Sequence, residues 1–387
     1  MNDTKKIVTH PDDVAALKEI VKSYGNKKTE TWDFSTPGQV SFPDNDLYDS
    51  VETQNGRLTT LHLSNNEIND LSPLSGLTAL TSLILADNEI NDLTPLAGLI
   101  NLTYLYLSDN EINDLSPLAG LTALTSLNLR ENEINDLSPL AGLTALTNLY
   151  LHDNEINDLS PLAGLAALTE LALPGNKLYD LSPLAGLAAL EHLDLSFNKM
   201  SDLSPLAGLA ALKCLNLSFN RKLMNLSPLA GLTALEHLDL SESRKIDDLT
   251  PLAGLTALEY LDLTNNRKIG DLTPLAGLTA LTHLDLFSNK KIADLSPLAG
   301  LTALEHLDLA NNREIIDLTP LAGLTALENL RLVFCVKIID LTPLAALPSL
   351  KRLDLEMSGL GGKRRADLGP LADKKDLKIY GVKYGDF

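Results

Sequence analysis

The sequence has few aromatic residues, few cysteines and no long apolar run. Aromatic residues make up 4 % of the 387 residues, and cysteine occurs only at Cys214 and Cys335. No stretch approaches the roughly 20 apolar residues of a membrane-spanning helix, and the first residues lack the apolar core of a signal peptide. We therefore expect no membrane insertion. As written, the chain is predicted to be cytoplasmic, and the removal of a leader would make it secreted or cell-surface instead.

Basic residues are also in short supply. The chain carries 31 Lys and Arg against 51 Asp and Glu, which gives a formal net charge of −20. A general nucleic-acid binder needs a basic face for its phosphate contacts, so this composition argues against nucleic acid as a partner. It favours solubility and a basic protein partner.

One pattern, L-x-x-L-x-L-x-x-N-x-I-x-D-L-S/T-P-L-A-G-L, dominates the chain. Its fourteen copies are 22 residues long at first and 23 residues long later, and they begin at Leu58, Leu80, Leu102, Leu124, Leu146, Leu168, Leu190, Leu212, Leu235, Leu258, Leu281, Leu304, Leu327 and Leu350. We expect three parts: an N-terminal helical cap over residues 1–57, the repeats over residues 58–360, and a C-terminal cap over residues 361–387.

Each position of the pattern has a physical role. The L-x-L core alternates as a strand does, and stacked copies bury its leucines in one core. The S/T-P-L-A-G-L segment predicts one helical turn, with Ser or Thr as N-cap, Pro in the first position and Gly at the end. The expected fold class is α/β: a leucine-rich repeat solenoid, a curved horseshoe with a concave parallel β-sheet and short helical turns on the convex side.

The Asn of the pattern falls where the chain leaves the strand. Its amide is expected to bond to backbone groups of neighbouring turns and so to form a ladder. Ser243, Cys335 and Ser358 replace it in three copies, which predicts that Cys335 is a buried structural thiol. Cys214 and Cys335 lie five repeats apart, about 24 Å at ~4.8 Å per strand, which is too far for a disulfide.

The segment LSPLAGLTALTSLNL and the 22-residue period resemble the leucine-rich repeats of bacterial internalins. They are also similar to the repeat class named after a eukaryotic regulator of protein phosphatase 1. Internalin-like proteins bind partner proteins through the concave face. The resemblance therefore implies a binding protein, without naming its ligand.

Both ends of the repeats require caps, because a solenoid otherwise exposes its core. Residues 12–24 predict an amphipathic helix with Asp12 or Asp13 as N-cap, and Asn55-Gly56 predicts a hairpin turn into the first strand. Together with Trp32, these features resemble the N-terminal cap of many plant and bacterial leucine-rich repeat proteins. The basic residues 363–365 are either a docking loop or a solvated loop. The C-terminal cap is expected to form from Leu368, Leu371, Leu377, Ile379 and Val382.

Residues that vary between copies mark the surface that the framework leaves free, and positions 3, 5, 7 and 8 of each repeat point to the predicted concave face. In the N-terminal half these positions hold aromatic and basic residues that are typical of interface hot spots. The alternative is that the tyrosines are strand formers that tolerate solvent. The candidate partner-binding residues are Tyr104, Tyr106, Arg130, Tyr150 and His152.

In the C-terminal half, position 5 is mostly Asp and position 3 often His. Stacked strands place like charges about 4.8 Å apart, so some of these Asp pKa values are expected to rise. The candidate partner-binding residues here are Asp239, Asp262, Asp285 and Asp308. A less favoured interpretation makes His283, His306, Asp285 and Asp308 a zinc site or a pH switch. The other interpretation is a row copied by duplication, with no metal bound.

The position after the Asn changes from Glu in the early repeats to Lys or Arg in the later ones. This basic rim either docks a dipolar partner or compensates the nearby aspartates. Four phenylalanines at variable positions are either edge packing or an apolar contact strip: Phe197, Phe219, Phe287 and Phe334.

No phosphate-binding loop, metal motif or nucleophile elbow is present, and the segments outside the repeats are too short for a catalytic domain. We therefore expect a non-enzyme that needs no cofactor and is a monomer. Three functions stay open: a protein–protein interaction module that uses the concave face, an intracellular regulatory subunit of a phosphatase-like enzyme, and a structural or designed repeat scaffold without a natural ligand.

Overall fold

The computed structural model describes residues 6–24, 40–42, 51–355 and 368–381 of the chain. These residues form an N-terminal unit (residues 1–190) and a C-terminal unit (residues 191–387). The expectations for Trp32, Ser358, residues 363–365 and Val382 concern positions outside the described residues.

Each repeat contributes one short strand, and within each unit neighbouring strands pair in parallel, in sequence order. In the N-terminal unit the parallel strands are β4 (Arg57–His62), β5 (Ser82–Ile84), β6 (Tyr104–Tyr106), β7 (Ser126–Asn128), β8 (Asn148–Tyr150) and β9 (Glu170–Ala172). In the C-terminal unit they are β10 (His192–Asp194), β11 (Cys214–Asn216), β12 (His237–Asp239), β13 (Tyr260–Asp262), β14 (His283–Asp285), β15 (His306–Asp308), β16 (Asn329–Arg331), β17 (Arg352–Asp354) and β18 (Lys378–Tyr380).

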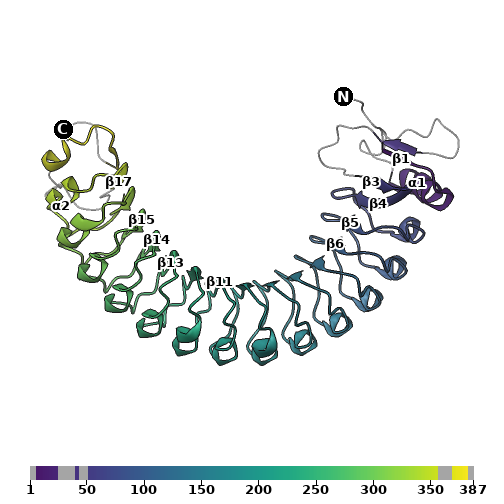
Figure 1. The fold of residues 1–387 in the computed structure, drawn as a ribbon, viewed down its shortest axis with the longest axis horizontal. Coiled ribbons are helices and arrows are strands. Elements are labelled where there is room, and N and C mark those ends of the chain that lie inside the picture. Colours follow the sequence, from purple (N-terminus) through teal and green to yellow (C-terminus); the bar gives the residue numbers. More distant parts are fainter. Residues whose placement is uncertain (1–5, 25–39, 43–50, 356–367, 382–387) are drawn as a thin grey trace. The chain divides into compact units, whose positions relative to one another are not determined.

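Short helical turns lie on the side of each unit opposite its strands (Figure 1). In the N-terminal unit they are the 3-10 helices η2 (Ser72–Leu74), η3 (Thr94–Leu96), η4 (Ser116–Leu118), η5 (Ser138–Leu140), η6 (Ser160–Leu162) and η7 (Ser182–Gly186). In the C-terminal unit they are η8 (Ser204–Leu206), η9 (Ser227–Gly231), η10 (Thr250–Leu252), η11 (Thr273–Leu275), η12 (Ser296–Leu298), η13 (Thr319–Gly323), η14 (Gly369–Leu371) and the α-helix α2 (Thr342–Ala345). The framework leucines between strands and turns are almost fully buried. The predicted leucine-rich repeat solenoid is confirmed.

The start of each helical turn differs from the prediction. Ser72 is the first residue of η2; the N-cap is Leu71, which makes no side-chain capping hydrogen bond. Instead, the backbone N–H of Ser72 donates to Oδ1 of Asp70 at 2.8 Å, and this contact recurs in most of the described repeats. The prediction that Ser or Thr is the N-cap was therefore wrong, because the framework Asp two residues earlier reaches the free backbone group first.

The glycine of the turn also behaves differently from the prediction. A terminating Gly would adopt a left-handed conformation, but the positive-φ glycines of the described chain are Gly56, Gly175 and Gly381, none of them in the S/T-P-L-A-G-L segment. In η7 the helix even extends through Gly186. In η3, as in most repeats, the helix ends at Leu96, before Gly98, and a Cβ at Gly98 would meet no atom within 4 Å.

The predicted asparagine ladder is present, and in the 22-residue repeats it satisfies both ends of the amide. Asn132 is buried; its Nδ2 donates to the carbonyl oxygen of Leu107 in the preceding repeat at 3.0 Å. Its Oδ1 accepts from the backbone N–H of Ile112 at 2.9 Å. Each such asparagine therefore fixes two backbone groups of the repeat before it.

The 23-residue repeats use only half of this interaction. Asn289 still donates to the carbonyl of Leu263 at 2.8 Å, but its buried Oδ1 has no hydrogen-bond partner among the described residues. The N–H that would serve it, on Ile269, donates instead to the carbonyl of Asn266 at 3.0 Å, across the turn that holds the additional residue. Here the asparagine acts as a donor only, and the ladder position requires no acceptor.

Cys335 shows the consequence of that change. Its fully buried thiol donates to the carbonyl of Leu309 at 3.0 Å, as the asparagine amide does elsewhere. Burial raises the pKa of the thiol to about 12, which keeps it protonated and able to donate. Cys335 is thus the buried structural thiol that the sequence predicted, and it stands in a repeat where an acceptor is not required.

The N-terminal end carries the predicted helix and hairpin. The helix α1 (Pro11–Tyr24) buries Val14, Leu17 and Ile20. The antiparallel strand β3 (Glu52–Gln54) joins β4 through Asn55-Gly56, both with positive φ, which confirms the predicted turn. A separate antiparallel pair consists of β1 (Lys6–Val8) and β2 (Val40–Phe42).

Neither aspartate is the N-cap of this helix, because α1 begins at Pro11 and contains both. The fully buried Asp13 accepts hydrogen bonds from Nε and Nη2 of Arg57, both at 3.0 Å, and from the backbone N–H of Leu58 at 2.8 Å. This carboxylate therefore ties the helix to the first strand of the repeats.

The C-terminal segment keeps more of the repeat than its sequence suggested. Residues 369–371 form the turn η14, and β18 pairs in parallel with β17. Leu371 is buried, whereas Leu377 and Ile379 are half-buried. The described part of this end is one further, less regular repeat stacked on the last strand.

Candidate protein-binding face

The strands present one outward-facing row of side chains on each side of a buried leucine. In β6, for example, Tyr104 and Tyr106 face outward, while Leu105 between them is fully buried. Parallel register then places position 3 beside position 3 and position 5 beside position 5 in the next repeat. We call this surface the sheet face, and all of the predicted partner-binding residues in strands lie on it.

The N-terminal unit carries a spaced group of tyrosines. Tyr104 is 50 % exposed and has Ser82 and Ser126 as its register neighbours. Tyr106 and Tyr150 lie in the same row but are separated by Asn128. The three rings are therefore brought onto one surface without being register neighbours of one another.

Polar contacts fix Arg130 and Tyr150 on this surface. Arg130 donates from Nη2 to Oδ2 of Asp109 at 3.1 Å and lies 3.3 Å from the carboxylate of Glu131. The rings of Tyr150 and His152 are 6.2 Å apart. Burial, followed by a hydrogen bond to Glu170, raises the pKa of Tyr150 to about 12, so the phenol stays neutral and its O–H is engaged by the Glu170 carboxylate.

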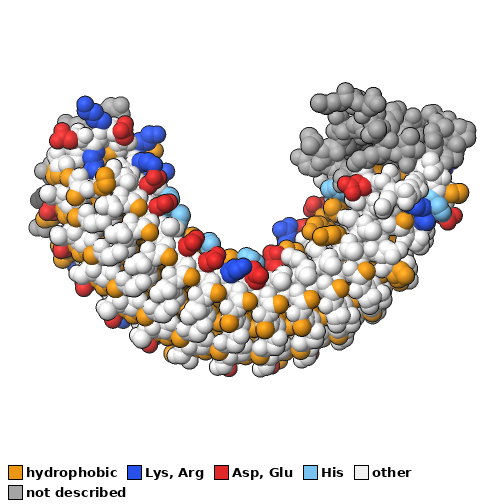
Figure 2. Space-filling model, in the orientation of Figure 1, with side chains coloured by type: hydrophobic (Ala, Val, Ile, Leu, Met, Phe, Trp, Pro, Cys, Tyr) orange, Lys and Arg blue, Asp and Glu red, His pale blue; other side chains and the backbone are white. Residues whose placement is uncertain are grey.

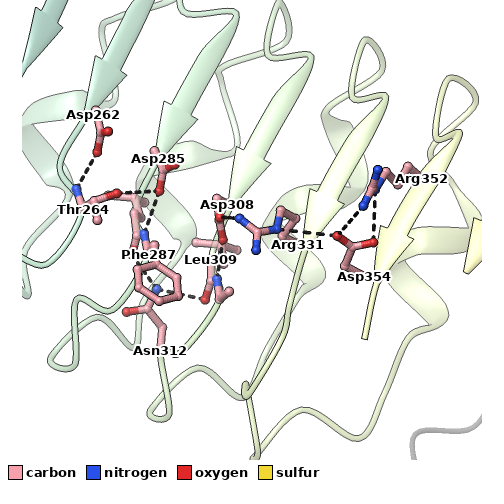
Figure 3. Close-up of polar contacts among 12 residues, drawn as sticks. Asp262, Thr264, Asp285, Phe287, Asp308, Leu309, Asn312, Arg331, Arg352 and Asp354 are labelled. Atoms are coloured by element: carbon pink, nitrogen blue, oxygen red, sulfur yellow. Dashed lines mark hydrogen bonds and ion pairs between the residues drawn. The ribbon is translucent and has the colours of Figure 1, made fainter. Parts of the chain in front are cut away.

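The C-terminal unit carries a row of aspartates at position 5 (Figure 2). Asp239, Asp262, Asp285 and Asp308 are register neighbours on β12 to β15. Each accepts a hydrogen bond through Oδ1 from the backbone N–H two residues later, at 2.7–3.0 Å. These bonds close the end of each strand and orient the carboxylates along one line, as three of the four in Figure 3 show.

The predicted rise of the aspartate pKa values is present, but its main cause differs. Burial raises the pKa of Asp262 to about 6 and that of Asp308 to about 6, and it raises the pKa of Asp239 as well. Repulsion from neighbouring carboxylates is a smaller contribution in all three. The strand-end position itself withdraws these carboxylates from water.

Two arginines near the end of this row are site residues that the sequence pattern did not predict. Arg331 occupies position 5 between Asp308 and Asp354 and forms ion pairs with both, the second at 3.5 Å (Figure 3). Arg352, at position 3 of the next strand, donates to both carboxylate oxygens of Asp354 at 3.2 Å. Counting position 5 through to the last repeats would have found Arg331.

An aromatic row lies beside the aspartates at position 3. The ring centroids of His237 and Tyr260 are 6.0 Å apart, those of Tyr260 and His283 6.1 Å, and those of His283 and His306 4.1 Å. Burial and the neighbouring His306 lower the pKa of His283. Within the described residues, no group of three or more His, Cys, Asp or Glu is placed to hold a metal ion, so the zinc interpretation gains no support.

The basic rim does not neutralise the aspartate row directly. Arg244 pairs with Glu242 at 2.6 Å, and Arg267 donates to Oδ1 of Asn265 at 3.1 Å. In the described part of the chain, no lysine or arginine of the rim forms an ion pair with the row. Direct compensation by the rim is therefore not what the structure shows.

Two phenylalanines form a further apolar spot on the C-terminal unit. Phe197 and Phe219 stack with ring centroids 4.0 Å apart, and Phe197 is 56 % exposed. Both have a positive φ, at a repeat position that Asp, Asn, Glu, Ser or Gly occupies in most other repeats. An aromatic residue is costly in this conformation, which favours a contact role over edge packing.

The raised pKa values make stability depend on pH. Between pH 6 and 4, Asp262 and Asp308 hold protons in the folded chain that they lose in the unfolded chain, so their contribution to the free energy of unfolding increases as the pH falls. His283 opposes this trend, and the turn aspartates, whose pKa values are lowered, lose stability below about pH 4. We expect Asp262→Asn with Asp308→Asn to stabilise the protein by about 1–2 kcal/mol at pH 7.5 and little at pH 4.5. Urea unfolding at both pH values measures this, and equal gains at the two would contradict it.

Within the described residues, no helix has both the length and the apolar character needed to cross a membrane. This finding concerns those residues alone.

Comparison with known proteins identifies the repeats. The family model "Leucine Rich repeats (2 copies)" matches more than half of the chain, at residues 57–98, 100–142, 122–164, 166–208, 188–231, 210–254, 233–277 and 279–323. No curated protein matches the chain.

Solved structures agree with the family model. The internalin InlF of Listeria monocytogenes is 36 % identical with a TM-score of 0.72, and the match covers 76 % of this chain and 86 % of that one. A leucine-rich repeat protein of Leptospira interrogans is 25 % identical, with a TM-score of 0.68 over 83 % of this chain and 89 % of that one. TLR13 in complex with ssRNA13 is 26 % identical, with a TM-score of 0.61 over 78 % of this chain and 50 % of that one. The chain therefore belongs to the leucine-rich repeat family and is an internalin-like member of it.

Proposed function

We propose that this protein binds a partner protein through the sheet face of its repeats, as a monomer without catalytic activity or a cofactor. Internalin-like repeat proteins are in general non-enzymatic interaction modules. The observation that carries the proposal is that the positions of each repeat have separate roles. Leucines fill the core, Asn and Asp bond to the backbone, and the remaining positions display Tyr, Arg, His and Asp on one surface.

A protein partner fits this surface better than a nucleic acid. TLR13 has been solved with ssRNA, so the fold itself does not exclude RNA. In this chain, however, the sheet face of the C-terminal unit carries a continuous row of carboxylates. Such a row repels phosphates, whereas tyrosines and an arginine in the N-terminal unit suit protein contacts.

The test compares two surface variants of the N-terminal unit. Tyr104→Ala, Tyr106→Ala and Tyr150→Ala remove the tyrosines of the sheet face. Ile100→Ala and Tyr179→Ala remove exposed apolar side chains, 60 % and 69 % exposed, outside that face. Tagged wild type and both variants are used to capture proteins from extracts, with quantitative mass spectrometry as the readout.

We expect a partner whose recovery falls at least tenfold with the tyrosine variant, since interface tyrosines often contribute 2 kcal/mol or more, and is unchanged with the control. A phosphatase among such partners would favour the regulatory-subunit hypothesis. If wild type and both variants captured the same set of proteins, none of this binding would depend on the tyrosines and the proposal would be wrong. That result would favour the repeat scaffold without a natural ligand.

A further inference from the structure

We propose that the sheet face of the C-terminal unit binds an arginine-bearing polypeptide segment over β12 to β14. This inference rests on the proposed function and adds the chemical class of the partner at this surface. Two rows of side chains form the site: the acidic row Asp239, Asp262 and Asp285, and the aromatic row His237, Tyr260 and His283.

The chain itself shows how arginine binds to such rows. Arg331 lies in line with the aspartates and pairs with a carboxylate on each side. Arg352 donates two hydrogen bonds of 3.2 Å to the carboxylate of Asp354. Its guanidinium carbon also lies 4.5 Å from the ring centroid of Tyr380. Carboxylates for bidentate hydrogen bonds and a ring for cation–π contact are thus used together at β16 to β18.

The same two kinds of group stand side by side at β12 to β14, without the arginines. No Lys or Arg of the described residues forms an ion pair with Asp239, Asp262 or Asp285. One oxygen of each carboxylate is engaged by a backbone N–H, which holds the group in a fixed orientation. A partner that brings guanidinium groups would complete the arrangement that Arg331 and Arg352 complete further along the row.

Arginine suits this surface better than lysine. A guanidinium presents a planar set of donors that matches carboxylate geometry and can stack on a ring, whereas an ammonium is a strongly hydrated point charge. The half-buried position of these aspartates also favours the more weakly hydrated cation, since binding removes water from both partners.

The test uses a fluorescein-labelled peptide of four Arg-Pro-Pro repeats and the full chain. In a polyproline helix its arginines recur about every 9.3 Å, close to the ~9.6 Å of two strand spacings. A lysine version of the peptide has the same charge and spacing. Fluorescence anisotropy at about 0.15 M salt gives the Kd of each.

Three variants separate a site from general attraction to an acidic protein. Asp239→Asn, Asp262→Asn and Asp285→Asn remove three charges and keep the oxygen that accepts each backbone bond. Glu89→Gln, Glu111→Gln and Glu133→Gln remove three charges from exposed positions of the N-terminal unit. Asp262→Arg places a guanidinium between two carboxylates, as Arg331 is placed. It is expected to fold even if the triple Asn variant does not, and so it keeps the test decisive.

We expect the Kd of the arginine peptide to rise at least tenfold with the Asn variant and with Asp262→Arg, and less than twofold with the Gln variant. The lysine peptide should bind at least threefold more weakly than the arginine peptide to wild type. Equal losses with the Asn and Gln variants, or equal binding of the two peptides, would overturn the inference. Either result would leave the tyrosine comparison of the proposed function untouched, because that comparison uses the N-terminal unit.

Discussion

Replacing Asp13 by alanine is expected to lower the free energy of unfolding by about 3 kcal/mol or more. The fully buried carboxylate accepts from two nitrogens of Arg57 and from the backbone N–H of Leu58. Its removal leaves a partly buried guanidinium without a counter-charge and an N–H at the start of the first repeat without an acceptor.

The neighbouring Asp12 supplies the control. Its side chain is 74 % exposed and lies 3.8 Å from His10, so Asp12→Ala should change stability by less than about 0.5 kcal/mol. Urea unfolding measures both variants, and amide exchange shows whether α1 separates before the repeats unfold. Equal effects of the two substitutions would show that the buried ion pair does not hold the helix.

The second large effect is expected to depend on repeat length. Asn132→Cys, in a 22-residue repeat, should destabilise the protein by about 2–3 kcal/mol, because the buried N–H of Ile112 loses its acceptor. Asn289→Cys, in a 23-residue repeat, should stay within about 1 kcal/mol of wild type. The Asn289 Oδ1 has no partner among the described residues, and a thiol can replace its donor as Cys335 does.

Chemical unfolding of the two single variants under reducing conditions measures the difference. The two substitutions exchange the same atoms at equivalent positions of the repeat, so each is the control for the other. If both destabilised the protein by the same amount, the additional residue would not be the reason that cysteine and serine occur at this position.

Much of the fold follows from periodicity. The Leu-x-Leu spacing and the asparagine ladder are local patterns repeated many times, and each copy supports the same assignment. Ser72 shows where this reasoning stops, because both it and Asp70 suit a capping position, and only the backbone geometry decides which oxygen reaches the free N–H. The glycine of the S/T-P-L-A-G-L segment was predicted to end the turn for a similar reason. That prediction assumed a left-handed conformation, which the chain does not adopt at these glycines.

The candidate site was predicted as a surface, but its energetics were not. Register alone places Asp262 between Asp239 and Asp285, which the repeat spacing predicts. The larger influence on the pKa of Asp262 is burial at the end of the strand, which depends on how the neighbouring turn folds over the carboxylate. Arg331 was not predicted because the prediction rested on the recurring aspartates at position 5, and Arg331 occupies that position in a repeat without the aspartate.

The aspartates that lie two residues before the helical turns place part of the negative charge away from the sheet face. Within the described residues, twelve aspartates from Asp70 to Asp340 accept a backbone N–H in this way, on the side of the repeats away from the sheet face. A basic molecule approaching from a distance is therefore attracted to either side, with a field that fades over about 8 Å at physiological salt. This long-range electrostatic attraction brings basic molecules near the protein but does not discriminate among them. Specificity therefore depends on the short-range contacts of the strands.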